Sequence, residues 1–109
     1  MARDRGLEEL IRERLDGMPG IVETTMFGGR AWLLHGHLVC GARDDGMLAR
    51  LGRDRDGWAL ALPGIAVMTS GERAMRGWVR ATADAFGDDA LRERLIAAAL
   101  AFAGSLPPK

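Results

Sequence analysis

Three side chains near the middle of the sequence have the chemistry of metal ligands: His35, His37 and Cys40. Imidazole nitrogens and thiolate sulfurs are the usual zinc ligands in proteins. On an extended strand, His37 and Cys40 are three residues apart and therefore point to opposite faces. His35 and His37 lie on either side of a turn glycine and can converge, but a structural zinc site needs four ligands. The sequence therefore predicts no metal site.

Cys40 with either histidine is also the one possible start of a nucleophilic active site, which needs a nucleophile, a base and an orienting group. No sequence signature around Cys40 supports that arrangement, and a lone cysteine in a strand is more typical of core packing. Gly28-Gly29 lacks the lysine and the helix start that make a phosphate-binding loop. The acidic residues show no spacing typical of a carboxylate pair. We therefore expect no catalytic residues, no cofactor and no enzymatic activity.

The better candidate is a contact surface made by Arg76, Trp78 and Arg80, which alternate along one predicted strand. The opposite face of that strand would carry Met75, Gly77, Val79 and Ala81. Arginine beside an aromatic ring binds bases, phosphates or a protein partner, and both residue types are common interface anchors. Two structural interpretations compete with this one. Arginine stems can shield the indole on an outward face, or Trp78 can turn into the core.

The elements that position these residues follow from hydrophobic periodicity. Apolar residues at helical spacing predict an amphipathic helix near the N-terminus, with Asp4 as its N-cap and Gly17 and Pro19 at its end. The apolar face consists of Leu7, Leu10, Ile11, Leu15 and Met18. The opposite, polar face carries Glu8, Glu9, Arg12, Glu13 and Arg14. Glu8 and Arg12 have the spacing of a helical ion pair.

From residue 21 the apolar period changes to two, which indicates strands. Runs at 22–27, 30–34, 37–43 and 47–51, separated by glycine-containing turns, predict a four-stranded antiparallel meander. His35-Gly36 has the form of a two-residue hairpin turn. Strands at 65–69 and 75–82, a loop at 84–89 and a helix from 91 to 106 complete the chain. Residues 53–62 fit either a strand or a short helix ended by Pro63-Gly64.

The length of 109 residues suits one domain, which we expect to span residues 1–109. The order of elements predicts an α+β two-layer sandwich, with an antiparallel sheet of five to six strands flanked by N- and C-terminal helices. The apolar run at residues 96–103, extended by Leu95, is far shorter than the ~20 residues of a membrane-spanning helix. The charged N-terminus does not resemble a signal peptide. We expect a soluble cytoplasmic protein.

Charge also bears on the choice of partner. Fifteen basic residues balance fifteen acidic ones, whereas domains that bind nucleic acid without sequence preference usually carry a basic excess. A neutral chain can still concentrate positive charge on one face. Fourteen of the fifteen basic residues are arginine. This bias fits a phosphate-binding surface or, more simply, the codon usage of a GC-rich genome.

Two sequence blocks carry a family resemblance. Met26-Phe27-Gly28-Gly29, followed by an apolar strand, the His35-Gly36 turn and another strand, resembles the N-terminal domain of TfoX/Sxy competence regulators. Residues 75–79 (Met-Arg-Gly-Trp-Val) and the C-terminal residues 101–109 resemble the small stand-alone branch of that family, so the resemblance covers nearly the whole chain. The motif positions are Met26, Phe27, Gly28, Gly29, Gly36, Met75, Gly77 and Trp78.

The resemblance implies a two-layer fold like that of type III secretion chaperones, and structural roles for the motif residues. Full-length regulators of this family promote transcription of competence genes, and the family offers no catalytic residues. We therefore expect a non-enzymatic regulatory or protein-interaction module, binding an unidentified protein or a second copy of itself as a homodimer. The alternative is a transcriptional regulator that binds nucleic acid through Arg76, Trp78 and Arg80. With Arg73 these arginines offer about three phosphate contacts, so we expect no duplex binding tighter than the weak non-specific range.

Overall fold

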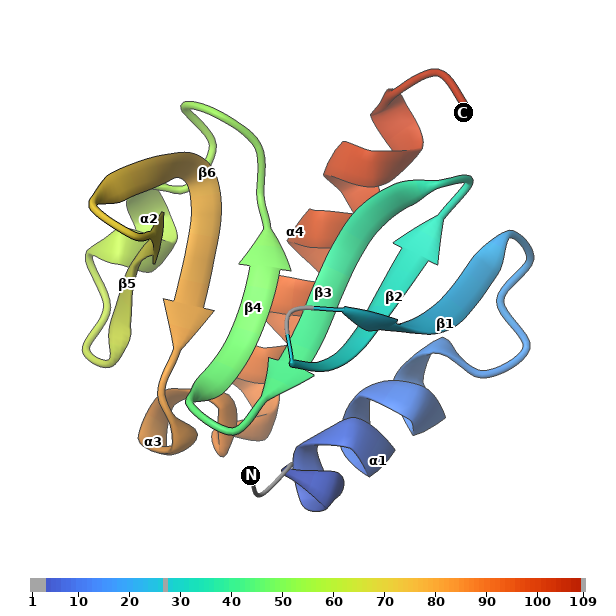
Figure 1. Ribbon diagram of the computed structural model, residues 1–109, viewed down its shortest axis with the longest axis horizontal. Coiled ribbons are helices and arrows are strands. Elements are labelled where there is room, and N and C mark those ends of the chain that lie inside the picture. Colours follow the sequence, from blue (N-terminus) through green and yellow to red (C-terminus); the bar gives the residue numbers. More distant parts are fainter. Residues whose placement is uncertain (1–3, 27, 109) are drawn as a thin grey trace.

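A computed structural model describes residues 4–26 and 28–108, in which six antiparallel strands and four helices form an α+β fold (Figure 1). The strands are β1 (Ile21–Met26), β2 (Gly29–Leu34), β3 (His37–Arg43), β4 (Gly46–Arg50), β5 (Ile65–Ser70) and β6 (Arg73–Ala81). The helices are α1 (Arg5–Leu15), α2 (Gly57–Leu60), α3 (Ala83–Phe86) and α4 (Asp89–Ser105). The predicted fold class is confirmed.

The sheet order is β1-β2-β3-β4-β6-β5, so the predicted meander of the first four strands is confirmed and β6 lies between β4 and β5. The ambiguous segment 53–62 contains the short helix α2. The prediction of a loop at 84–89 is wrong for residues 84–86, which belong to α3. Its backbone amides at Ala85 and Phe86 donate to the Thr82 carbonyl, and both side chains are buried. Burial of these two apolar side chains favours a helical turn where the sequence shows only a capping pattern.

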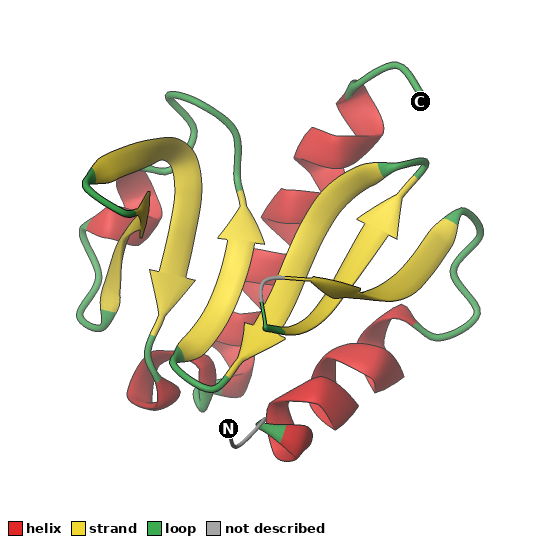
Figure 2. Cartoon of the chain, in the orientation of Figure 1, coloured by secondary structure: helices red, strands yellow, loops and turns green. Residues whose placement is uncertain are grey.

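Helices α1 and α4 pack against one face of the sheet, and α4 runs behind its central strands (Figure 2). The predicted apolar positions Leu7, Ile11 and Leu15 are buried in this core. Leu10 and Met18, predicted on the same face, are 38% and 36% exposed, respectively. Met18 lies beyond the end of α1, which explains its exposure. Within the described residues, no helix is long and apolar enough to span a bilayer.

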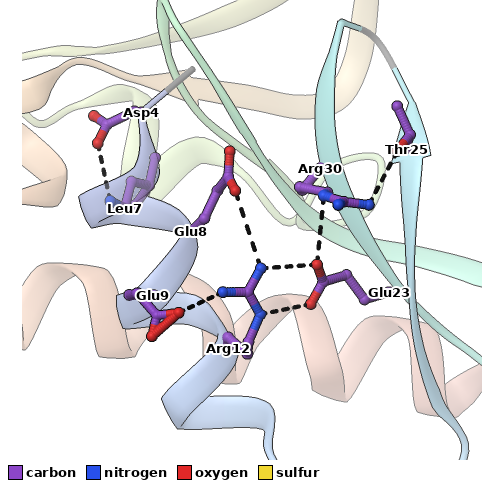
Figure 3. Close-up of polar contacts among 8 residues, drawn as sticks. All are labelled: Asp4, Leu7, Glu8, Glu9, Arg12, Glu23, Thr25 and Arg30. Atoms are coloured by element: carbon purple, nitrogen blue, oxygen red, sulfur yellow. Dashed lines mark hydrogen bonds and ion pairs between the residues drawn. The ribbon is translucent and has the colours of Figure 1, made fainter. Parts of the chain in front are cut away.

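One polar cluster joins α1 to the sheet (Figure 3). Nε and Nη2 of Arg12 each donate to a carboxylate oxygen of Glu23 on β1, both at 2.9 Å, and Nε of Arg30 on β2 lies 3.6 Å from the same carboxylate. Our placement of Glu8 on the exposed polar face is wrong, because Glu8 is only 2% exposed and lies 4.0 Å from Arg12. Glu8 thus belongs to the same polar cluster as Arg12.

The electrostatic consequence is a depressed pKa for Glu23. Hydrogen bonding to Arg12 is the largest cause, and it outweighs the opposing effect of partial burial. The same contacts, with those of Glu9, raise the pKa of Arg12 above its usual value. This cluster therefore stabilises the folded state most when Glu23 is ionised.

Two glycine turns form the hairpins on either side of β2. His35 and Gly36 both have positive φ (51° and 86°), which confirms the two-residue hairpin turn. Gly28 has φ +76°, and a Cβ added to the neighbouring Gly29 would lie 2.0 Å from the Ala42 carbonyl oxygen. Of the motif residues beside these glycines, Met26 is partly exposed and Phe27 lies outside the described residues.

We predict that Gly28→Val and Gly29→Val both destabilise the protein, for different reasons. Gly28 needs a backbone conformation that costs other residues about 1–3 kcal/mol. Gly29 faces backbone at a distance that no side chain tolerates, so its variant should lose more stability. Thermal or urea unfolding measures both. Gly104→Ala in α4 is the control, and should gain about 0.5–1 kcal/mol as a glycine replaced inside a helix. Unchanged melting of both valine variants would contradict the prediction.

We also predict that Glu23 makes the stability of this protein depend on pH. A carboxyl group with a lowered folded-state pKa stabilises the fold above its unfolded pKa of about 4.3, and this contribution disappears as the pH falls through the folded value. Glu23→Gln should therefore be less stable than the parent at pH 7, and the difference should vanish in acid. Urea unfolding at several pH values measures it. Glu13→Gln, at an exposed position, should show no such trend.

Candidate anion-binding surface beside Trp78

The predicted contact strand, β6, is not regular. Met68 of β5 pairs with Met75 of β6, but the adjacent Val67 pairs with Val79. One step along β5 therefore corresponds to four residues along β6, which leaves residues 76–78 as an insertion in the pairing. The extra residues include Gly77, whose φ is +87°. The strand bends sharply at this end (Figure 1). Arg76, Trp78 and Arg80 nevertheless alternate with the buried Gly77, Val79 and Ala81, as predicted.

Gly77 connects this bend to the segment between β4 and α2. Its carbonyl accepts hydrogen bonds from the amides of Leu51 (2.7 Å) and Gly52 (3.1 Å), and its amide donates to Oδ2 of Asp56 (3.2 Å). A Cβ on Gly77 would lie 2.6 Å from the backbone nitrogen of Arg53. Only glycine permits both the positive φ and this close approach. The contact brings arginines that are distant in sequence to one end of the molecule.

Two adjoining hollows lie at this end of the molecule. The larger one, which we call the arginine hollow, has a volume of about 500 Å³ and is lined by Arg53, Ser70, Arg73, Ala74, Met75, Arg76 and Trp78. The smaller, of about 210 Å³, is lined by Arg50, Gly52, Arg53, Arg76, Gly77, Trp78 and Phe102. Every charged residue lining either hollow is an arginine. The surface thus concentrates positive charge on a chain whose formal net charge is zero.

The aromatic residues at this end are covered by guanidinium groups. Cζ of Arg50 lies 5.4 Å from the centroid of the Trp78 ring and 5.2 Å from that of Phe102. Cζ of Arg55 lies 5.9 Å from the Phe102 ring. These distances fit cation–π contacts. They agree with the interpretation in which arginine shields an outward-facing indole, and Trp78 is half-buried rather than inserted into the core.

The arginines at this end of the molecule have no carboxylate partner among the residues that the structure describes. Among residues 4–26 and 28–108, no carboxylate lies within 4.0 Å of the guanidinium nitrogens of Arg50, Arg53, Arg55, Arg73 or Arg76. By contrast, Arg12, Arg14 and Arg92 each pair with a glutamate or aspartate. Guanidinium groups bind carboxylates and phosphates through paired hydrogen bonds. The surface can therefore bind an anionic group from outside the chain.

The structure divides the three residues of the predicted contact surface. Arg76 and Trp78 line the arginine hollow. Arg80 lies toward the other end of β6, where its Nη1 is 3.4 Å from Oδ2 of Asp45. Sequence reasoning missed Arg50, Arg53 and Arg55 as members of the surface. The charged run 53–56 held the signal, but nothing local in it points to β6.

The predicted ligand-type residues are placed apart from this surface. A bulge leaves Val39 as an extra residue between the pairs Trp32–Cys40 and Leu33–Leu38. It puts His37 and Cys40 on the same face, contrary to our expectation from regular alternation. Cys40 is fully buried, and burial raises the pKa of its thiol to about 12. His37 Nε2 lies 2.7 Å from the Pro107 carbonyl oxygen. The described residues contain no group of three or more side chains placed to hold a metal ion.

We predict that Gly77→Ala destabilises the protein and disturbs the surface. Positive φ costs alanine about 1–2 kcal/mol, and displacement of the Arg53 backbone adds to this cost. Gly57→Ala is the matched control, because no atom lies within 4 Å of its added Cβ and its φ is not positive. In urea unfolding, the free energy of unfolding of Gly77→Ala should be lower than that of Gly57→Ala by more than about 1 kcal/mol. Equal stability would show that the bend does not require glycine.

Comparison with known proteins addresses the family of this chain. No curated protein and no solved structure matches it significantly. The model of the TfoX N-terminal domain family matches residues 13–103, a range that includes all six strands and both arginine-lined hollows. This match confirms the resemblance inferred from the motif residues, and the chain belongs to the TfoX N-terminal domain family.

Proposed function

We propose that this chain is a non-enzymatic regulatory module that works by binding another protein through the surface beside Trp78. The observation that carries the proposal is that Arg50, Arg53, Arg73 and Arg76 line the hollows beside Trp78 and have no carboxylate partner among the described residues. Membership of the TfoX N-terminal domain family supports a regulatory or interaction role in general terms. Arginine and tryptophan are also the residues that most often dominate binding energy at protein interfaces.

The chemistry of the surface favours binding over catalysis. The residues lining the arginine hollow include no carboxylate, histidine or cysteine that would transfer a proton or attack a substrate. Arginine stays protonated and acts here as a hydrogen-bond donor. A half-exposed cationic surface of this kind selects a partner by charge and shape. We place this activity in the cytoplasm, where an unpaired cysteine such as Cys40 is usual.

A protein partner fits the charge distribution better than duplex DNA. The exposed side chains of Asp54 and Glu72 directly adjoin Arg53 and Arg73 in the chain. A continuous phosphate backbone would run past these carboxylates and meet repulsion. A protein partner can present separate charged groups that avoid them. The zero net charge of the chain also gives no long-range attraction to nucleic acid.

We predict that substitution of the hollow arginines abolishes partner capture. The test variant is Arg53→Ala/Arg73→Ala/Arg76→Ala, and the control with the same charge loss is Arg5→Ala/Arg14→Ala/Arg94→Ala. Tagged parent and both variants serve as baits in lysate of the native host, with mass spectrometry as the readout. A protein enriched by parent and control, and lost with the hollow variant, is the expected result. Equal capture by all three baits would contradict the proposal.

Fluorescence anisotropy with a labelled 20-base-pair duplex tests the nucleic-acid alternative. At physiological salt we expect no binding tighter than the non-specific range of about 10⁻⁴–10⁻⁶ M. Sub-micromolar affinity that disappears in the hollow variant, but not in the control, would replace the protein-binding proposal with the nucleic-acid one.

A further inference from the structure

We infer that the arginine hollow binds two neighbouring carboxylates of an acidic segment in the partner protein. The inference rests on the proposed function and specifies the chemistry of the partner. Arg53, Arg73 and Arg76 line the hollow together with the hydroxyl-bearing Ser70. Three permanently charged fork-shaped donors can hold more than one carboxylate, since a single carboxylate accepts two parallel hydrogen bonds from one guanidinium.

Two other hollows in this protein show how an arginine side chain obtains hydrogen-bond acceptors. In a hollow of about 180 Å³ beside the end of α1, Arg12 meets the carboxylate of Glu23 with two hydrogen bonds of 2.9 Å. In another, between α1 and α4, Arg14 binds both carboxylate oxygens of Glu93. The arginine hollow has the same type of cationic wall but no carboxylate among its lining residues. A carboxylate from a partner would complete it in the same way.

The remaining walls of the hollow fit a polypeptide. Ala74, Met75 and Trp78 supply apolar surface beside the guanidinium groups. The aliphatic stems of aspartate or glutamate can pack on such a surface while the carboxylates reach the arginines. A volume of about 500 Å³ accommodates a few side chains, not the width of a duplex. The exposed Asp54 and Glu72 would limit the acidic stretch to a short one.

The backbone around the hollow is held in position before any partner arrives. Arg53 packs against Gly77 through its backbone, and Arg76 directly precedes Gly77. The backbones of two of the three lining arginines are therefore held at Gly77, whose own carbonyl and amide are hydrogen-bonded. A site whose backbone is already placed loses less entropy on binding.

The test uses a fluorescein-labelled decapeptide of alternating glutamate and serine, with the glutamine-for-glutamate peptide as its control. Anisotropy titrations use the full chain at 50 mM and 200 mM salt. We expect the glutamate peptide to bind at least about tenfold more tightly than the glutamine peptide, the loss expected when charge-assisted hydrogen bonds are removed. Arg53→Ala/Arg73→Ala/Arg76→Ala should reduce glutamate-peptide binding by the same factor. The Arg5→Ala/Arg14→Ala/Arg94→Ala control should not.

Two further measurements make the result decisive. The hollow variant should melt with the parent, because these three arginines have no carboxylate partner among the described residues to lose. Arg53→Lys/Arg73→Lys/Arg76→Lys keeps the charge but loses the fork geometry, and should bind the glutamate peptide with intermediate affinity.

Equal affinity for the two peptides, or equal loss in the hollow and control variants, would overturn the inference. Self-association of the parent would also overturn the inference if it is reversed by salt and lost in the hollow variant. In that case a second copy of this chain would occupy the hollow. Tighter binding of a labelled duplex would replace the acidic segment with nucleic acid. If the peptides fail but capture from lysate still requires the hollow, the proposed function stands and only the carboxylate chemistry is wrong.

Discussion

The contact between Gly77 and the β4–α2 connection is the constraint on which the candidate surface depends. The Gly77 carbonyl accepts two amide hydrogen bonds, and its amide donates to Asp56. The connection also passes through the space that a side chain at Gly77 would occupy. Backbone groups buried without partners are costly, so a bend in a strand must satisfy the groups it withdraws from the sheet. Here the connection supplies those partners. The bend and the connection therefore stabilise each other.

A functional consequence follows from this constraint. The connection carries Arg53 and Arg55, while the bend carries Arg76 and precedes Trp78. When the two segments meet, their cations meet as well, and like charges repel. Cation–π contacts from Arg50 and Arg55 offset part of this cost, but no described carboxylate neutralises the group. An anionic partner would relieve the repulsion, which links the fold to the proposed binding activity.

Elsewhere in the molecule, charge has a different role. Arg12 joins α1 to β1 through Glu23, and Arg14 joins α1 to α4 through Glu93. The two pairs hold the N-terminal helix against β1 and against α4. Their stabilising effect requires that Glu23 and Glu93, whose pKa values are lowered, are ionised. Arginine thus stabilises the fold where a carboxylate is within reach, and it lines the proposed binding surface where the described residues supply none.

The sequence by itself determined the α+β class, the four-stranded meander, the position of α1 and the two-residue turn at His35-Gly36. These features depend on short-range periodicity and on φ preferences, which a few neighbouring residues express. The sequence also suggested Arg76 and Trp78 as surface residues. It left residues 53–62 open between a strand and a short helix, and it did not reveal the burial of Glu8, the helical state of residues 83–86 or the bulge in β3. Packing decides these features, because it offsets local preferences of a few tenths of a kcal/mol to about 1 kcal/mol.

Only the tertiary structure decided which arginines form the surface. Arg53 and Gly77 are remote in sequence, and their contact exists because β6 bends and the β4–α2 connection crosses it. No pattern within either segment predicts that crossing. The paired state of Arg80 likewise depends on Asp45, which lies on a different hairpin. Whether an arginine is paired depends on which carboxylate the completed fold brings within reach, and that is a long-range property of the chain.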